Sequence, residues 1–356
     1  MTALGGSHSS PLMTVALAWA NEGINDPGAL RVERRLGAVR GVERLEWLNP
    51  VMGQILLVNR LKEGLTVTPG TRTNATAIVS LASKPIYTLE RPNDNDDLLA
   101  QSKHIFAAFD LRADRSAEIY LQQWDMLSFL GSSLQLNAIS QGWTLALLEA
   151  VMSAAMNIVA EVKYRMDLPR PVDLYPQLAP IIQTPQHSAL PSGHASEGFA
   201  AAYVLSRLKG LTDAETVSHE NLIFRMASRI AINRTVAGVH YPMDSMAGAC
   251  LGITLGRVFW SRICHEDGGQ DIQEPASGFD IAAHAFGGQN FTLSELLRFV
   301  SPKPDSSDPA WLVARPPVPF SEPIDGKPEL AWVRDKAVAE LTRTITATSI
   351  DPAAVV

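Results

Sequence analysis

The stretch PSGHAS, from Pro191 to Ser196, precedes a long apolar segment and predicts the start of a buried helix. Pro191 breaks the preceding structure, and Ser192 is a residue type that often caps a helix. Gly193 lets a ligand approach the backbone closely, and His194 brings a titratable ring into the first turn. The unpaired N–H groups and the positive dipole end of such a helix favour a bound anion. Taken alone, the stretch equally fits an ordinary N-cap followed by a surface histidine.

Helical patterns dominate the rest of the chain, whereas patterns typical of strands are scarce. We therefore expect an all-α protein built as a helical bundle. Gly248, Gly252 and Gly256 recur every four residues, which would let another helix pack closely against theirs. The predicted helices are Pro11–Asn21, Gly41–Lys62, Asp96–Phe109, Arg115–Leu130, Ala138–Met166, Gly193–Lys209, Glu220–Ile232 and Pro242–Ile263.

Composition divides the chain into three expected regions. We expect residues 1–135 to form an N-terminal helical region and residues 136–265 to form a helical bundle, which the motifs described below mark as catalytic. Residues 266–356 are rich in proline, so we expect an irregular segment that wraps the core before a last helix from about Pro328 to Thr344.

The chain has 356 residues, of which 46% are hydrophobic, and can bury a large core. Its net charge of −7 argues against a nucleic-acid partner or an anionic membrane held by bulk electrostatics. Any anion site must therefore be locally basic. The cysteines, Cys250 and Cys264, fit small core residues, because their spacing matches neither a disulfide framework nor a metal site.

The segment MTALGGSHSSPLMTVALAWANEG, residues 1–23, has no basic residues ahead of its apolar part, so we expect no standard secretory signal. Two stretches approach the length of a membrane span, Gly142–Ala160 and Met246–Trp260. Glu149 and Asn157 interrupt the first, and the second is too short. We expect a soluble protein without a membrane partner, cytoplasmic or exported after processing. A lipid-embedded first stretch is the alternative.

In a second motif, KYRMDLPRP, six residues separate Lys163 from Arg170 and Pro171. Prolines on both sides of Arg170 cannot lie in a helix interior, so the chain must leave the helix that carries Lys163 and turn back. This geometry can aim two cations at one point. The alternative is a solvated helix end whose positive charges favour the dipole.

A third motif, NRTVAGVHYPMD, spaces Arg234, His240 and Asp244. Pro242 fits an early position of the next helix, so Asp244 falls in its first turn and can fold back towards His240. A carboxylate on the imidazole Nδ1–H would fix the tautomer and leave Nε2 free and basic.

The three motifs resemble those of one superfamily, which joins type-2 phosphatidic acid phosphatases, bacterial non-specific acid phosphatases and vanadium-dependent haloperoxidases. Its signature reads Lys-x6-Arg-Pro, then Pro-Ser-Gly-His, then Arg-x5-His-x3-Asp, and this chain carries all three in order. Leu190 and Asn233 stand where the pattern more often has an aromatic residue and a serine. The resemblance implies a helical bundle of the vanadium haloperoxidase or acid phosphatase type.

The resemblance also implies one oxyanion site, for phosphate or for a vanadate cofactor. His240 would bond to phosphorus or, as the metal ligand, to vanadium, and Asp244 would support its ring. His194 would be the acid and base. The residues that would hold the oxygens of the anion are Lys163, Arg170, Ser192, Gly193 and Arg234.

His187 bears on the choice between the two chemistries. It lies seven residues before His194, the offset at which algal vanadium bromoperoxidases carry a histidine and fungal chloroperoxidases a phenylalanine. We therefore expect a vanadium-dependent haloperoxidase that oxidises bromide or iodide with hydrogen peroxide, in which His187 assists catalysis. The alternative for this residue is an ordinary loop histidine.

Other functions stay open. A soluble acid phosphatase would hydrolyse phosphate monoesters through a phosphohistidine on the same His240. A lipid phosphatase and a module that binds phosphate without turnover are further alternatives. In each case we expect a homo-oligomer.

Overall fold

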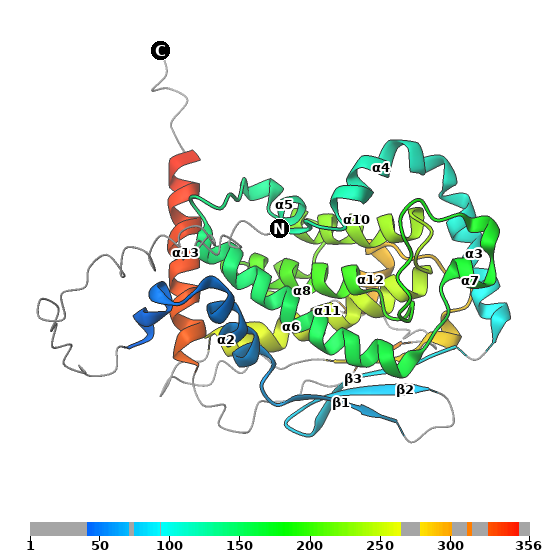
Figure 1. Ribbon diagram of the computed structural model, residues 1–356, viewed down its shortest axis with the longest axis horizontal. Coiled ribbons are helices and arrows are strands. Elements are labelled where there is room, and N and C mark those ends of the chain that lie inside the picture. The colour runs from blue at the N-terminus through cyan, green and yellow to red at the C-terminus, as the bar shows by residue number, and fades with distance from the viewer. Residues whose placement is uncertain are drawn as a thin grey trace, which may run out of the picture.

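The structure, a computed structural model, describes residues 41–70, 75–92, 94–264, 278–300, 312–314 and 327–348. Its centre is a helical bundle in which α8 (Gly193–Leu208) packs against the helices around it. Nearly every residue of α8 is buried, so this helix has no solvent face that would need polar side chains. The surrounding helices are α6 (Gly142–Met166), α10 (Leu222–Val236) and α11 (Pro242–Cys264) (Figure 1).

Glycines let α8 and α11 approach each other closely. A Cβ added at Gly248 would lie 2.6 Å from the carbonyl oxygen of Ser192, and one at Gly252 would overlap the carbonyl oxygen of Ser196. The glycine spacing in the sequence therefore serves helix packing. Since Ser192 is the N-cap of α8, the same contact positions the beginning of that helix.

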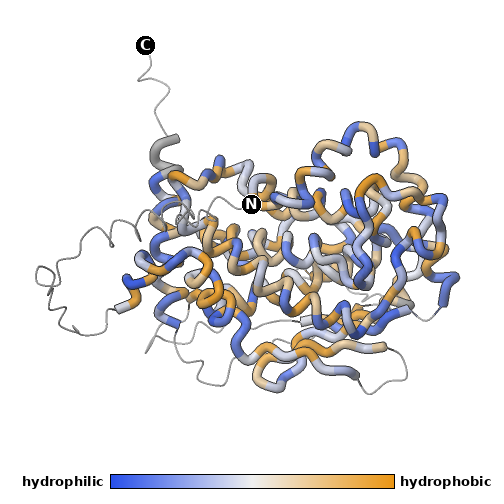
Figure 2. Tube along the Cα trace, viewed as in Figure 1, coloured by the Kyte–Doolittle hydropathy of each residue, from blue (hydrophilic) through white to orange (hydrophobic). Residues whose placement is uncertain are grey.

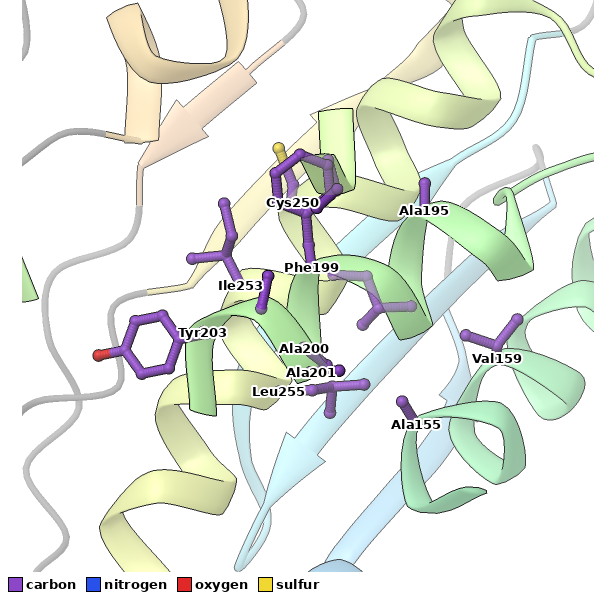
Figure 3. Close-up of a cluster of buried hydrophobic side chains, with 14 of the residues drawn as sticks. Ala155, Val159, Ala195, Phe199, Ala200, Ala201, Tyr203, Cys250, Ile253 and Leu255 are labelled. Carbon is purple, nitrogen blue, oxygen red and sulfur yellow. The ribbon is translucent and has the colours of Figure 1, made fainter. Parts of the chain in front are cut away.

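Apolar side chains fill the space between the central helices. Val159 of α6, Phe199 of α8 and Ile253 of α11 all belong to this core (Figure 3). Cys250 is buried in it, whereas Cys264, at the end of α11, is partly exposed and packs against its margin. Both cysteines are free thiols.

A five-stranded sheet lies along the side of the bundle formed by α6 and α11 (Figure 1). β1, β2 and β3 form an antiparallel meander, β4 pairs in parallel with β3, and β5 pairs antiparallel with β4. Tyr87, opposite Phe279 in the sheet, donates a hydrogen bond of 3.0 Å to the carbonyl of Ala247 on α11. The strands are β1 (Leu65–Pro69), β2 (Thr76–Leu81), β3 (Lys84–Glu90), β4 (Phe279–Ala282) and β5 (Leu312–Ala314).

Shorter elements surround this centre. The last helix crosses the end of the bundle opposite to α3 and α7 (Figure 1), and hydrophobic residues concentrate on the central helices and the strands facing them (Figure 2). The elements are η1 (Val42–Trp47), α2 (Pro50–Lys62), α3 (Asn95–Ala107), η2 (Phe109–Leu111), α4 (Arg112–Leu121), α5 (Leu127–Leu130), η3 (Ser132–Leu134), α7 (Pro171–Leu174), η4 (Pro176–Leu178), α9 (Asp213–Thr216), η5 (Ala283–Phe286), α12 (Leu293–Val300) and α13 (Pro328–Thr348).

The expectation of an all-α fold is therefore wrong in part, since the protein is mostly helical with a small mixed sheet. The turn between β2 and β3 lacks the residues that usually indicate a hairpin in a sequence. Ala82 and Ser83 form it with positive φ values of 47° and 66°, where glycine or asparagine usually marks such a turn. β4 and β5 are too short to give an alternating pattern of their own.

Other element boundaries also differ from the predictions. Gly41–Lys62 is not one helix, because Asn49 caps a new helix that begins at the following proline. Arg115–Leu130 is divided between α4 and α5. Between residue 266 and the last helix, in the segment expected to be irregular, the described parts contain β4, η5, α12 and β5. The predicted helix Pro11–Asn21 lies outside the described residues, and the division into three regions stays a prediction.

Of the described helices, α6 is long and apolar enough to cross a membrane. Half of its most apolar window of 18 residues is buried within the protein. The core helix of a soluble protein passes the same test of length and composition. The expectation of a soluble protein stays a prediction.

Candidate active site

Five segments bring the three motifs together around one cavity of about 1010 Å³. They are the last turns of α6, the loop on either side of α7, the N-terminus of α8, the end of α10 and the loop into α11. Seven of the predicted site residues line the cavity: Lys163, Arg170, His187, Gly193, His194, Arg234 and His240. Ser192 and Asp244 lie behind this lining and are fully buried.

A chain of hydrogen bonds fixes the ring of His240. Its Nδ1 lies 2.9 Å from Oδ2 of Asp244, which also accepts a bond of 2.9 Å from the backbone N–H of Tyr241. On the other side, Nη1 of Arg170 donates to Nε2 of His240 at 3.0 Å. Because a guanidinium can only donate, Nε2 must be an acceptor and the ring proton must be on Nδ1. The sequence expectation for Asp244 and His240 agrees with this geometry.

The three cations of the site are buried. Lys163 donates from Nζ to the carbonyls of Ser188 and Ala189, at 2.7 and 3.2 Å. Arg234 donates only from Nη2, at 3.3 Å to the carbonyl of Ile119 and at 3.2 Å to Oε1 of Gln122. Its Nε and Nη1 are buried and bond to no described residue.

Buried donors without acceptors are costly, so these two N–H groups of Arg234 call for an anion. Burial lowers the pKa of Arg234 to about 10, which still leaves the guanidinium charged at neutral pH. Burial likewise lowers the pKa of Arg170, and the Asp244 carboxylate opposes that shift. The cavity therefore holds fixed positive charge, although the whole chain is acidic.

The N-terminus of α8 faces the same cavity. Gly193 and His194 occupy its first turn, where no preceding turn supplies carbonyl acceptors for the backbone N–H groups. Ser192 is the N-cap, and its hydroxyl accepts from the N–H of Ala195 at 3.4 Å. Its predicted contact with an anion stays a prediction, because the structure places this hydroxyl in a helix cap.

His194 lies near the carbonyl of Gln122, with Nε2 at 3.2 Å from the oxygen. Burial first, and then the charge of Arg234, lower the pKa of His194 to about 3, so the ring is neutral at neutral pH. A bound anion would act in the opposite direction and raise the pKa of this ring.

His187 is positioned by Arg170, whose Nη2 lies 3.0 Å from Nδ1 of the imidazole. The backbone carbonyl of His187 accepts a second bond, of 3.0 Å, from Nε of the same guanidinium. Nδ1 also lies 3.2 Å from the carbonyl oxygen of Ser188, but a guanidinium can only donate, so Nδ1 is the acceptor for Arg170 and the ring carries its proton on Nε2. Burial and the charge of Lys163 lower the pKa of His187.

Burial dominates the electrostatics around His240. It holds the pKa of His240 well below its usual range, and the charges of Arg170 and Lys163 act in the same direction. Burial also lowers the pKa of Lys163 and raises that of Asp244, while the attraction between the two charges opposes both shifts. The ring of His240 is thus neutral, as a nucleophile or a metal ligand must be.

Sequence reasoning does not find two residues of the site. Gln122, at the C-cap of α4, holds Arg234 through its side chain and meets His194 through its carbonyl. Glu197 lines the cavity from the second turn of α8. Gln122 lies too far along the chain from the motifs for residue spacing to connect it with them. Glu197 follows Gly193 by four residues, so the helical period could have placed it on the same face of the helix as Gly193.

Residues 138–264 match the family model of the PAP2 superfamily. This region contains all three motifs, and the resemblance seen in the sequence is confirmed. The chain is also 29% identical over 135 residues to decaprenylphosphoryl-5-phosphoribose phosphatase of Mycobacterium tuberculosis, from strains CDC 1551 / Oshkosh and ATCC 25618 / H37Rv. That match covers 38% of this chain and 68% of the relative.

Among solved structures, the first bacterial vanadium-dependent iodoperoxidase shares 21% sequence identity with the chain, at a TM-score of 0.33. The match covers 44% of this chain and 48% of the other, so it spans about half the length of that protein.

Proposed function

We propose that this protein is a phosphatase that hydrolyses phosphate monoesters through a phosphohistidine on His240. One observation carries the proposal: a neutral imidazole, held by Asp244 with its Nε2 unprotonated, faces a cavity lined by Lys163, Arg170 and Arg234. Fixed cations around a nucleophile are what the anionic transition state of phosphoryl transfer requires. The similarity to a phosphatase supports this function over the haloperoxidase expected from His187.

Each residue has a part in the proposed reaction. Nε2 of His240 attacks phosphorus while the bond from phosphorus to the ester oxygen breaks, and Asp244 stabilises the charge that develops on the ring. The bound anion raises the pKa of His194, and the protonated ring then supplies a proton to the leaving oxygen. In the second step His194 takes a proton from water, whose oxygen attacks phosphorus and breaks the phosphorus–nitrogen bond. The products are the alcohol and inorganic phosphate, and both histidines return to their first state.

Arg234 and the N-terminus of α8 hold the phosphoryl oxygens in this scheme. The two N–H groups of Arg234 that bond to no described residue, and the backbone N–H groups of Gly193 and His194, are the available donors. Lys163 also lines the cavity and contributes its charge, while its ammonium donates to two carbonyls.

Hydrolysis of p-nitrophenyl phosphate tests the proposal. The purified protein should release p-nitrophenol and phosphate, inorganic phosphate and orthovanadate should inhibit competitively, and His240→Ala should lose at least about 10³-fold in kcat. Exposed His219 provides the control, because His219→Ala should keep wild-type activity. A lack of hydrolysis of any phosphate monoester would contradict the proposal.

A vanadium-dependent haloperoxidase is the second candidate, and the position of His187 favours it. The imidazole lines the cavity and carries its proton on Nε2, so it can donate a hydrogen bond to a bound group. The basic cavity fits vanadate as well as phosphate, with His240 as the ligand, and bound vanadate would supply the Lewis acid that activates hydrogen peroxide towards a halide. Vanadate-dependent oxidation of bromide or iodide that falls in His187→Ala, with vanadate affinity unchanged, would support this candidate. A vanadate-loaded protein without such activity would exclude it.

A further inference from the structure

A second cavity, of about 830 Å³, adjoins the proposed active site. The two cavities share the wall residues Trp124, Met126, Met152, Met156 and Glu197. A ligand whose phosphoryl group lies among the cations would reach the second cavity between these residues. In a phosphate monoester, the part that extends is the leaving group.

Glu197 is a polar member of this shared wall. It follows Gly193 by one helical turn, and its Oε1 lies 3.3 Å from the point where a Cβ on Gly193 would stand. The missing side chain of Gly193 thus gives room for the carboxyl group. Although Glu197 is only 7% exposed, its carboxyl makes no hydrogen bond or ion pair with the described residues.

A carboxyl group that borders a cavity without a partner in the protein is open to a hydrogen bond with a ligand. Burial raises the pKa of Glu197 to about 8, and the charge of Lys163 opposes the shift. At neutral pH the group is therefore mainly a carboxylic acid, which can both donate and accept a hydrogen bond. A hydroxyl group has the same two capacities.

The second cavity contains further groups that match hydroxyls. Oε1 of Gln54 is buried and accepts no hydrogen bond from the described residues. Its Nε2 donates to Oε2 of Glu149 at 3.3 Å, and burial, with the nearby Asp125 charge, raises the pKa of Glu149. Carboxyl and amide groups line the second cavity, whereas the cations lie in the first.

We propose that Glu197 determines specificity for the leaving group by hydrogen bonding to a hydroxyl close to the ester oxygen, so that monoesters of polyols are preferred over alkyl monoesters. The inference rests on the proposed phosphatase function. Glu197 would contact substrate without taking part in bond making or breaking. If its role were only structural, replacing it would change the hydrolysis of all monoesters alike.

A matched pair of substrates tests this. 2-Hydroxyethyl phosphate and propyl phosphate are nearly equal in size and differ in one terminal hydroxyl. The wild type should favour the hydroxylated ester about 5-fold in kcat/KM, the worth of one net hydrogen bond. Glu197→Leu should bring the ratio to about 1, chiefly through KM, while Glu197→Gln, which can still donate and accept, should keep most of it. Glu161→Gln, an exposed change on α6, is the control.

The outcomes separate the two proposals. Equal kcat/KM for both esters in the wild type, or an unchanged ratio in Glu197→Leu, would overturn the role of Glu197 while p-nitrophenyl phosphate hydrolysis still supports a phosphatase. If no ester is hydrolysed, the proposed function fails. The dissociation constants of the two esters then test Glu197: a preference of about 5-fold for the hydroxylated ester that is lost in Glu197→Leu supports its role, and equal constants overturn it. Should Glu197→Leu not fold, Glu197→Ala provides the same comparison.

Discussion

Nη1 of Arg170 donates a hydrogen bond to Nε2 of His240 at 3.0 Å, so an arginine occupies the lone pair that the proposed reaction uses. The same guanidinium holds the backbone and the ring of His187. For His240 to attack phosphorus, Nη1 must move from the imidazole to a phosphoryl oxygen. This exchange replaces a neutral acceptor by a charged one and therefore favours the bound state.

Asp244→Asn tests the support of the imidazole. The amide can still meet Nδ1, but it can do so as a donor, which favours the wrong tautomer, and it does not stabilise the charge on the ring. We expect kcat for p-nitrophenyl phosphate to fall about 10- to 100-fold, with a smaller change in the inhibition constant of phosphate. Unchanged kcat would mean that Asp244 serves only the first turn of α11, where a carboxylate also favours the helix dipole.

Arg234→Met tests the anion site directly. Inorganic phosphate should raise the midpoint of thermal unfolding of the wild type, because a ligand that binds only the folded state stabilises it. In the variant, phosphate should bind about 10- to 100-fold more weakly, since hydrogen bonds between charged groups are lost. The shift at a given phosphate concentration should shrink accordingly. Arg225→Met, an exposed change on the same helix, should keep the full shift, and an equal loss in both variants would refute a site at Arg234.

Alanine substitutions at two glycines distinguish the effect of helix packing on stability from the effect of helix propensity. Gly252→Ala should destabilise the protein by about 1–3 kcal/mol, because the new methyl group would overlap the carbonyl of Ser196 and lie 3.0 Å from Cβ of Phe199. Gly198→Ala, within α8 and with nothing within 4 Å of the added Cβ, should instead stabilise by about 0.5–1 kcal/mol. Denaturation in urea measures both, and equal effects would contradict the close approach of α8 to α11.

The buried histidines give a pH dependence of stability with a definite sign. The pKa of His194 is about 3 in the folded protein and about 6.5 in the unfolded chain, so the unfolded state binds more protons between these values. The free energy of unfolding should therefore fall as pH falls below about 6.5, by roughly 1–2 kcal/mol from this residue at pH 5.

His194→Gln should lessen this loss, whereas His219→Gln, at an exposed position, should leave it unchanged. Urea denaturation at pH 7.5 and pH 5 gives the comparison. A loss of stability that is the same in all three proteins would show that His194 is not buried in its neutral form.

Spacing in the sequence predicts which candidate residues meet around one cavity better than it predicts the sheet. The motif residues lie at fixed offsets from predicted turns and helix ends, so their spacing in the sequence already indicates that they can meet. These residues are Lys163, Arg170, His194, Arg234 and His240. Gln122 could not be found, since its contact with Arg234 depends on how α4 packs against α10. No spacing within the chain carries that information.

The sheet could not be predicted from the sequence. β3 and β4 are far apart in sequence, and their parallel pairing, with Tyr87 opposite Phe279, depends on long-range contacts rather than local pattern. Glu197 is an intermediate case. Its position one turn after Gly193 is readable from the helical period, but its lack of a partner is visible only in the structure.

In the proposed reaction His240 becomes phosphorylated. Rapid acid-free quenching of the protein with ³²P-labelled p-nitrophenyl phosphate should trap a phosphoryl group that is labile in acid and stable in base, on the peptide that contains His240. His194→Ala should accumulate more of it, because water is activated slowly, and His240→Ala should carry none. Two results would contradict a phosphohistidine on His240: ester hydrolysis at the wild-type rate in His240→Ala, or label on a residue other than His240.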